Sequence, residues 1–245
     1  MTFKPITFSI TSNDMTKCPC CGQDITEELL VQEDIYKGID ELVDELNFDN
    51  ISKSICMCKS CGFILDDIFV EKIDQIKPLV MSDAYKSYII KEDMDDTYKK
   101  LRLYAYLYGI ISEEDNYANF IAGVMFLKLY DLVELTNLQY EYEEDLEPDN
   151  ILLFAMEYLN DYVMNQLKTG TIDEQMFGYA SVILLDTYRR SRTDEKLFYD
   201  TLNVLNNIIS WNDGDDSVGK KLIDQEIEWV KHKVYTKQVL TSHIK

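Results

Sequence analysis

The chain has 245 residues, 46% of them hydrophobic, and a formal net charge of −21. It is long enough for a small domain and a larger one, and its few glycines and prolines, nine and four, favour long helices. The acidic excess would repel nucleic-acid phosphates and anionic lipid, and no apolar run approaches the roughly 20 residues that cross a bilayer, so we expect neither direct nucleic-acid binding nor membrane insertion.

All six cysteines lie between residues 18 and 61, in two clusters, and each cluster contains C-x-x-C followed by glycine. Two such pairs are typical of a tetrahedral site in which four thiolates bind one Zn²⁺. A complete set of four sulfurs leaves no position for water or substrate. We therefore predict one structural zinc per chain, with the ligands Cys18, Cys21, Cys58 and Cys61.

Cys20 and Cys56 are alternative ligands that could replace one of these four. The preferred interpretation is that they pack as small apolar side chains. A disulfide framework is disfavoured because the first residues show no signal-peptide pattern, and a cytoplasmic location is expected. A redox C-x-x-C usually stands alone beside a βαβ pattern, whereas here two pairs follow the alternating residues Ile6, Phe8 and Ile10.

The zinc-binding module is predicted to span residues 1–78 and to contain an inserted helix. Asp24 and Glu27 have capping-box spacing, and apolar residues recur at helical intervals from Ile35 to Leu46. A second helix, carrying Phe69 and Ile76, is expected to stop near Pro78. A loose boundary follows, between residues 78 and 95.

Residues 95–245 are predicted to form an all-α domain. Apolar stripes indicate helices at 95–111, 115–136, 149–168, 173–191, 194–210 and 217–238. Short loops between long helices require antiparallel hairpins, arranged as a bundle or a solenoid, and we prefer the solenoid. The predicted fold class is mainly α, with a small zinc-ribbon-like head.

Two CPxCG-type knuckles followed by these helices resemble an uncharacterised bacterial family with a zinc-ribbon-like head and TPR-like helices. The segments that carry the resemblance are Leu103–Tyr108, Ala122–Tyr130 and Leu184–Arg190. The resemblance implies a TPR-like antiparallel helical-hairpin scaffold and implies no substrate.

Signals for catalysis are few. The two histidines are His232, near the end of the last helix, and His243, close to the last residue. No phosphate-binding glycine loop, nucleophile elbow or H-E-x-x-H motif occurs. We expect no enzymatic activity.

Candidate partner contacts come from two residue types. Tyr104 and Tyr108 share one helical face and could present a binding surface. Arg189, Arg190 and Arg192 are predicted chiefly to neutralise carboxylates, with an anion or partner contact as the alternative. The acidic run at 141–149 is interpreted as a solvated loop or a strip for a basic partner, and residues 212–216 as a turn.

The sequence thus predicts a noncatalytic, zinc-stapled scaffold that recognises a protein or peptide. The alternative is an acidic inhibitor or nucleic-acid mimic that blocks a basic partner, and an enzyme of unknown class stands third. The identity of the partner and the oligomeric state are left open by the residues.

Overall fold

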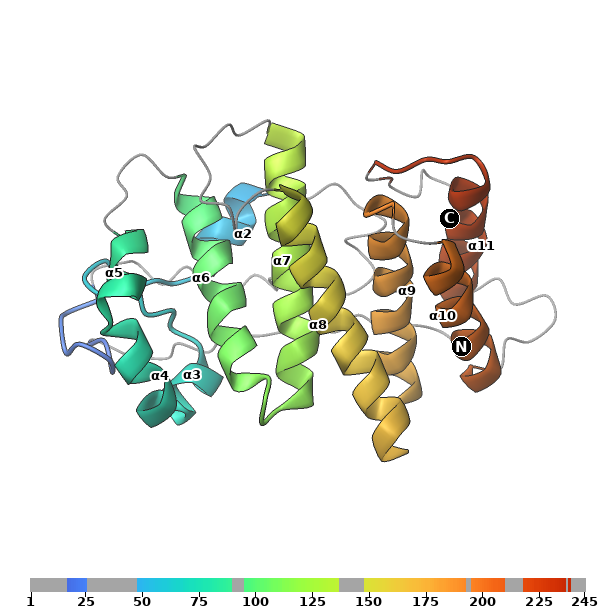
Figure 1. The fold of residues 1–245 in the computed structure, drawn as a ribbon. Coiled ribbons are helices and arrows are strands. Elements are labelled where there is room, and N and C mark those ends of the chain that lie inside the picture. Colours follow the sequence, from blue (N-terminus) through green and yellow to red (C-terminus); the bar gives the residue numbers. More distant parts are fainter. Residues whose placement is uncertain are drawn as a thin grey trace.

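The computed structural model describes residues 17–25, 48–89, 95–136, 148–192, 195–209, 218–236 and 238. These residues form ten helices and two isolated β-bridges, which confirms the mainly helical prediction (Figure 1). Within the described ranges, no helix combines the length and apolar character that a bilayer crossing needs.

Four short helices precede and follow the second cysteine turn in the sequence: α2 (Phe48–Ser54), α3 (Asp67–Glu71), α4 (Ile73–Val80) and α5 (Asp83–Ile89). The single helix predicted after the cysteines is therefore two, α3 and α4. The predicted stop near Pro78 is confirmed to within two residues, because α4 ends at Val80. Pro78 lies in the last turn, and because it has no N–H it cannot donate to the carbonyl oxygen of Asp74, one turn earlier.

Six longer helices follow at the predicted positions: α6 (Asp96–Ile111), α7 (Asn116–Thr136), α8 (Pro148–Thr169), α9 (Glu174–Arg190), α10 (Glu195–Ile208) and α11 (Val218–Lys231). Asp95 and Asp173 accept hydrogen bonds from the first-turn N–H groups of α6 and α9 and so fix where these helices begin. The last helix ends at Lys231 instead of 238, since Lys233 adopts a φ of 57° that stops a right-handed helix.

Figure 1 shows α6 to α11 as a row in which each helix up to α10 packs against the next. The links at 112–115 and 170–173 are short, so α6 with α7, and α8 with α9, form antiparallel hairpins. Helix α9 contacts α8, α10 and α11. It is the most enclosed of the six, with a run of buried residues from Phe177 to Arg190.

The short helices share one hydrophobic core with the row. Ile51 and Ile55 are buried beside α6, and Lys100 of α6 donates to the carbonyl oxygen of Ser52 over 3.0 Å. The division into residues 1–78 and 95–245 stays a prediction. These contacts predict that the two parts stabilise each other.

Several predicted features lie outside the described residues. They are the strand-like Ile6, Phe8 and Ile10, the capping-box Glu27 and the helix from Ile35 to Leu46, the acidic run up to Glu147, the turn at 212–216, and His243.

The α7–α8 contact depends on Gly123. A Cβ atom there would lie 2.7 Å from Leu159 Cγ and 3.1 Å from the carbonyl oxygen of Ala155, so the two helices would have to separate. We expect Gly123→Ala to lower the free energy of unfolding by about 1–3 kcal/mol in urea denaturation. Gly109→Ala is the control, because its Cβ would meet the hydroxyl end of the Tyr158 side chain, which can move away from it. Equal effects at both sites would contradict this account of the contact.

Candidate metal centre

Two backbone turns with the same hydrogen bonding carry the four predicted ligands. In the first turn the N–H of Cys18 donates to the carbonyl oxygen of Gln23, and that of Gly22 to the carbonyl oxygen of Cys18, both over 2.8 Å. In the second, Cys58 donates to Phe63 over 2.9 Å and Gly62 to Cys58 over 2.7 Å. The repeated C-x-x-C-G sequence thus folds twice into one local structure.

The glycine in each turn is required by its conformation. Gly22 and Gly62 have φ values of 77° and 72°, in the left-handed region that other residues adopt only with strain. An isolated antiparallel bridge closes each turn, between Lys17 and Asp24 and between Met57 and Ile64. The described residues form these bridges in place of the strands of a zinc ribbon.

Backbone N–H groups inside each turn point at the first cysteine sulfur. Those of Cys20 and Cys21 donate to Cys18, and those of Ser60 and Cys61 donate to Cys58. Such bonds favour the thiolate over the thiol. Both turns are therefore organised to hold a negatively charged sulfur.

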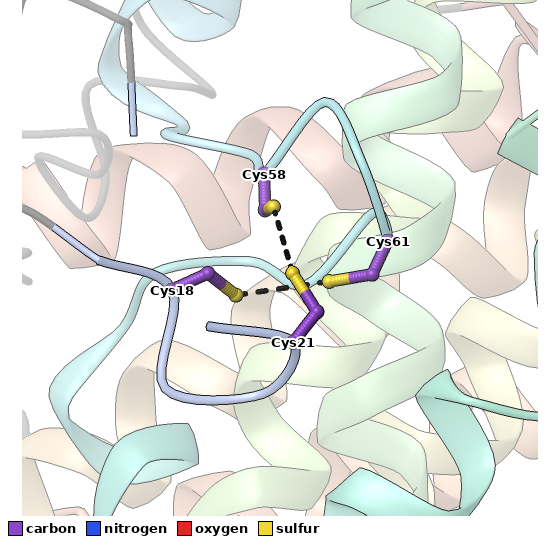
Figure 2. A group of neighbouring side chains, drawn as sticks. All are labelled: Cys18, Cys21, Cys58 and Cys61. Atoms are coloured by element: carbon purple, nitrogen blue, oxygen red, sulfur yellow. Dashed lines mark hydrogen bonds between the residues drawn. The ribbon is translucent and has the colours of Figure 1, made fainter. Parts of the chain in front are cut away.

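The four sulfur atoms converge on one point (Figure 2). Cys18 Sγ lies 3.7 Å from Cys61 Sγ, Cys21 Sγ lies 3.7 Å from Cys58 Sγ, and all four lie within 4.8 Å of one another. A tetrahedron with bonds of about 2.3 Å to four sulfurs has sulfur–sulfur edges of about 3.8 Å. A disulfide needs about 2.05 Å, so the spacing fits a metal ion and excludes disulfide bonds.

Charge and burial both favour a cation at the centre. Hydrogen bonding with Cys61 lowers the pKa of Cys18 to about 5, and the same bond together with burial raises the pKa of Cys61. The two sulfurs therefore hold one proton between them, and a divalent cation would displace it. Cys18, Cys58 and Cys61 are buried, and Cys21 is partly exposed.

The two alternative ligands are not part of this group. Cys20 and Cys56 are buried but lie outside the set of mutually close sulfurs. Burial and the neighbouring Cys18 raise the pKa of the Cys20 thiol, which favours the neutral form. Both residues contribute to the hydrophobic core that surrounds the turns.

Asp66 connects the second turn to α6. Its side chain caps α3 by accepting from the N–H of Ile68 over 3.0 Å, and its other oxygen accepts from the hydroxyls of Tyr104 and Tyr108 over 2.5 and 3.0 Å. Tyr85 of α5 also donates to the carbonyl oxygen of Gly62 over 2.9 Å. The second cysteine turn is thus held by side chains from two helices.

The predicted binding role of Tyr104 and Tyr108 needs correction. Both are buried, at 2% and 4% exposure, and pack against Phe69 with ring centroids 5.8 and 4.8 Å away. Burial raises the pKa of both hydroxyls, so they remain hydrogen-bond donors to Asp66. The face that carries these tyrosines is the core face of α6, and neither is presented to a partner.

Sequence reasoning missed Asp66 and Tyr85. The available signal for Asp66 was its place directly before a helix that begins with acidic Asp67, which is typical of an N-cap residue. Nothing in the sequence pattern pairs Tyr85 with the backbone of Gly62, because that contact depends on how α5 folds back over the turn.

Arg189 and Arg190 are buried in an ion-pair cluster between helices. Arg189 donates to Glu226 over 2.7 Å and to Asp186, and Arg190 donates to Asp131 and Asp186. The Arg189 guanidinium also lies 5.0 Å from the ring centroid of Trp229. The Arg190 guanidinium lies 4.8 Å from the ring centroid of Tyr130. The cluster joins α9 to α7 and α11, and the ion pairs with Asp131 and Asp186 agree with the neutralising role predicted for these arginines.

Arg189 also fixes the segment after α11. It donates to the carbonyl oxygens of Val234 and Thr236 over 2.7 and 2.9 Å. Arg192, in contrast, is exposed, with its guanidinium 5.4 Å from the Tyr235 ring centroid. His232 is exposed and lies 3.8 Å from Glu228, in a surface contact without the features of a catalytic base.

Glu226 should make stability depend on pH. Burial and the nearby Asp186 raise its pKa to about 8, so the folded chain keeps a proton that the unfolded chain releases near pH 4.5. This stabilisation is complete below about pH 4.5 and is lost as the pH rises through about 8. We expect Glu226→Gln to become more stable relative to wild type with rising pH, by up to about 1.4 kcal/mol per pH unit. Urea denaturation between pH 5 and 8 measures this, and parallel stability curves would contradict it.

Comparisons of the chain with protein-family models, with curated proteins and with solved structures each gave no match.

Proposed function

We propose that the protein is a noncatalytic interaction scaffold in which a structural Zn²⁺ staples the N-terminal turns to a TPR-like row of helices. The observation that carries this proposal is the closed group of four sulfurs. The Sγ atoms lie 3.7 Å apart both in the Cys18–Cys61 pair and in the Cys21–Cys58 pair. Four thiolates complete the coordination of zinc, so the ion supports the fold and has no position open for a substrate.

The surroundings of the group support a structural role. Its second turn leads directly into Asp66, which binds two tyrosines of α6, and Tyr85 holds the carbonyl oxygen of Gly62. Zinc would therefore fix the position of α3 and α5 against the row. A surface made by several helices is then kept rigid for binding, which limits the conformational entropy lost on association.

The scaffold is proposed to recognise a protein or peptide. Helical hairpins in a row offer extended surfaces to partners, and several large apolar side chains on them are exposed, among them Tyr106, Leu153 and Phe154. An acidic inhibitor that blocks a basic nucleic-acid-binding partner is the alternative, and it would act through charge spread over the whole surface.

Capture of partners from the native host tests this proposal. Tagged wild-type protein should retain a specific protein after the salt concentration is raised from about 0.1 to about 0.5 M, because apolar contacts are little screened. Cys58→Ser is the matched variant and should lose that protein. A partner that is released completely at the higher salt would favour the acidic inhibitor. Failure to retain any specific protein at either salt concentration would contradict both.

A further inference from the structure

The geometry points to a docking surface for a basic peptide segment on α6, α7 and α8. It consists of Tyr106, Phe126, Phe154 and Tyr158, here called the aromatic strip, with Glu157 and Asp161 beside it. This inference rests on the proposed function, because it names the surface and the partner chemistry of the interaction scaffold.

The aromatic strip is continuous across three helices. The rings of Phe126 and Tyr158 are stacked, with centroids 5.7 Å apart and an interplanar angle of 4°. Phe154 lies 5.4 Å from Phe126 by ring centroids. The hydroxyl of Tyr158 reaches α6 at Gly109, one turn after Tyr106. The ring of Tyr106 continues the strip to Tyr85 of α5, with centroids 6.4 Å apart.

The strip is accessible at both ends. Tyr106 is 46% exposed and Phe154 37% exposed, whereas Tyr158 is half-buried and Phe126 is buried between them. Leu153, beside Phe154 on α8, is 41% exposed. Large apolar side chains that gather across neighbouring helices mark a binding surface more strongly than apolar residues scattered singly. Aromatic residues are also the most frequent anchors in protein interfaces.

The two carboxylates beside the aromatic strip favour a positively charged partner. Glu157 and Asp161 are exposed on α8, and both raise the pKa of the Tyr158 hydroxyl in addition to the effect of its burial. In the part of the chain that the structure describes, neither carboxylate has a salt-bridge partner, whereas Asp224 and Glu228 of α11 each have a lysine. Lysine or arginine side chains of a partner would pair with these carboxylates and stack on the rings.

A second copy of this chain does not meet that requirement. Two molecules with a formal charge of −21 repel each other, and an acidic peptide or a nucleic acid would be repelled as well. A segment with basic and apolar side chains is complementary to this surface, because its apolar side chains pack on the aromatic strip and its basic ones pair with Glu157 and Asp161. The partner is therefore a peptide or protein segment of this composition.

The test uses a defined probe and exposed residues. The probe is a fluorescently labelled lysine–leucine peptide of about five helical turns, with leucines at helical spacing. We expect it to bind the full-length, zinc-loaded protein, and the Tyr106→Ala/Phe154→Ala variant to weaken binding about tenfold or more in fluorescence anisotropy. Glu157→Gln/Asp161→Asn should weaken it by about threefold or more. A glutamate–leucine peptide should not bind.

The matched control is Leu197→Ala/Tyr199→Ala on α10, where the side chains have similar exposure of 42% and 37%. It should change the affinity less than about twofold, and circular dichroism should show that all variants are folded. Equal weakening by both double variants, or no binding of the probe, would overturn the proposal. A dimer in sedimentation that the strip variant dissociates would replace the basic peptide with a second copy.

The two proposals can fail separately. If the strip variant still retains the protein captured from the host, the docking surface is wrong while the interaction function stands. If no host protein is captured but the probe binds at the strip, the surface is a peptide site and the proposed cellular role fails.

Discussion

Serine in place of Cys58 or Cys61 is expected to release the metal and unfold the turns that it joins. Each turn supplies two sulfurs to the group, so losing one thiolate leaves three negative charges around an incomplete shell. Binding of a structural zinc contributes on the order of 10 kcal/mol to the fold of such a module. Elemental analysis should give about one zinc per chain for wild type and almost none for these variants.

Cys20→Ser is the control for the choice of ligands. Cys20 lies next to Cys21 in sequence and is buried, but its sulfur is outside the group of four. Its substitution should leave the zinc content unchanged and cost only the packing of one small buried side chain. Loss of zinc in Cys20→Ser with retention in Cys18→Ser would show that the ligand set is wrong.

Metal removal should also affect the helices without abolishing them. Their apolar faces pack mainly against one another from α6 to α11, so most of the helical circular dichroism signal should remain after chelation. Asp66, Tyr104 and Tyr108 lose their mutual alignment, however, and we expect a lower melting temperature for the remaining helices. An unchanged melting temperature would show that the two parts are energetically independent.

Arg190→Ala should be among the most destabilising single substitutions in the chain. The guanidinium is buried and pairs with Asp131, Asp186 and Glu134, so its removal takes away a positive charge that compensates buried carboxylates. Breaking a buried ion pair from one side typically costs about 3–5 kcal/mol. Urea denaturation should show a loss of this size, and an effect below about 1 kcal/mol would mean that solvent reaches the cluster.

Arg192→Ala provides the matched control. It is an arginine two residues further along the chain, but it is exposed and contacts only the Tyr235 ring among its described partners. Its loss should cost less than about 1 kcal/mol. Arg190→Met/Asp131→Leu should recover part of the stability, because apolar side chains of similar size replace the charges on both sides.

The sequence pattern was sufficient to predict which four cysteines come together and where the long helices lie. Both are local features: C-x-x-C-G forces a tight turn with two sulfurs on one side, and apolar residues at helical spacing define a helix wherever the chain supplies them. The end of α11 was missed because the positive φ of Lys233 has no sequence signal such as glycine.

The sequence pattern could not predict the tertiary contacts. Tyr104 and Tyr108 share a helical face, and periodicity alone does not say whether that face meets solvent or another helix. The deciding partners, Phe69 and Asp66, lie more than thirty residues earlier in the chain. Tyr106 is the exposed tyrosine of α6, and it lies on the opposite side of the helix from Tyr104 and Tyr108.

X-ray absorption at the zinc edge of the purified protein tests the central claim most directly, because it counts the atoms bound to the metal. The four converging sulfurs predict a first shell of four sulfur atoms at about 2.3 Å and no lighter neighbour. A shell with three or fewer sulfurs and a nitrogen or oxygen atom would contradict the account, because it would show an open coordination position and a metal able to take part in chemistry.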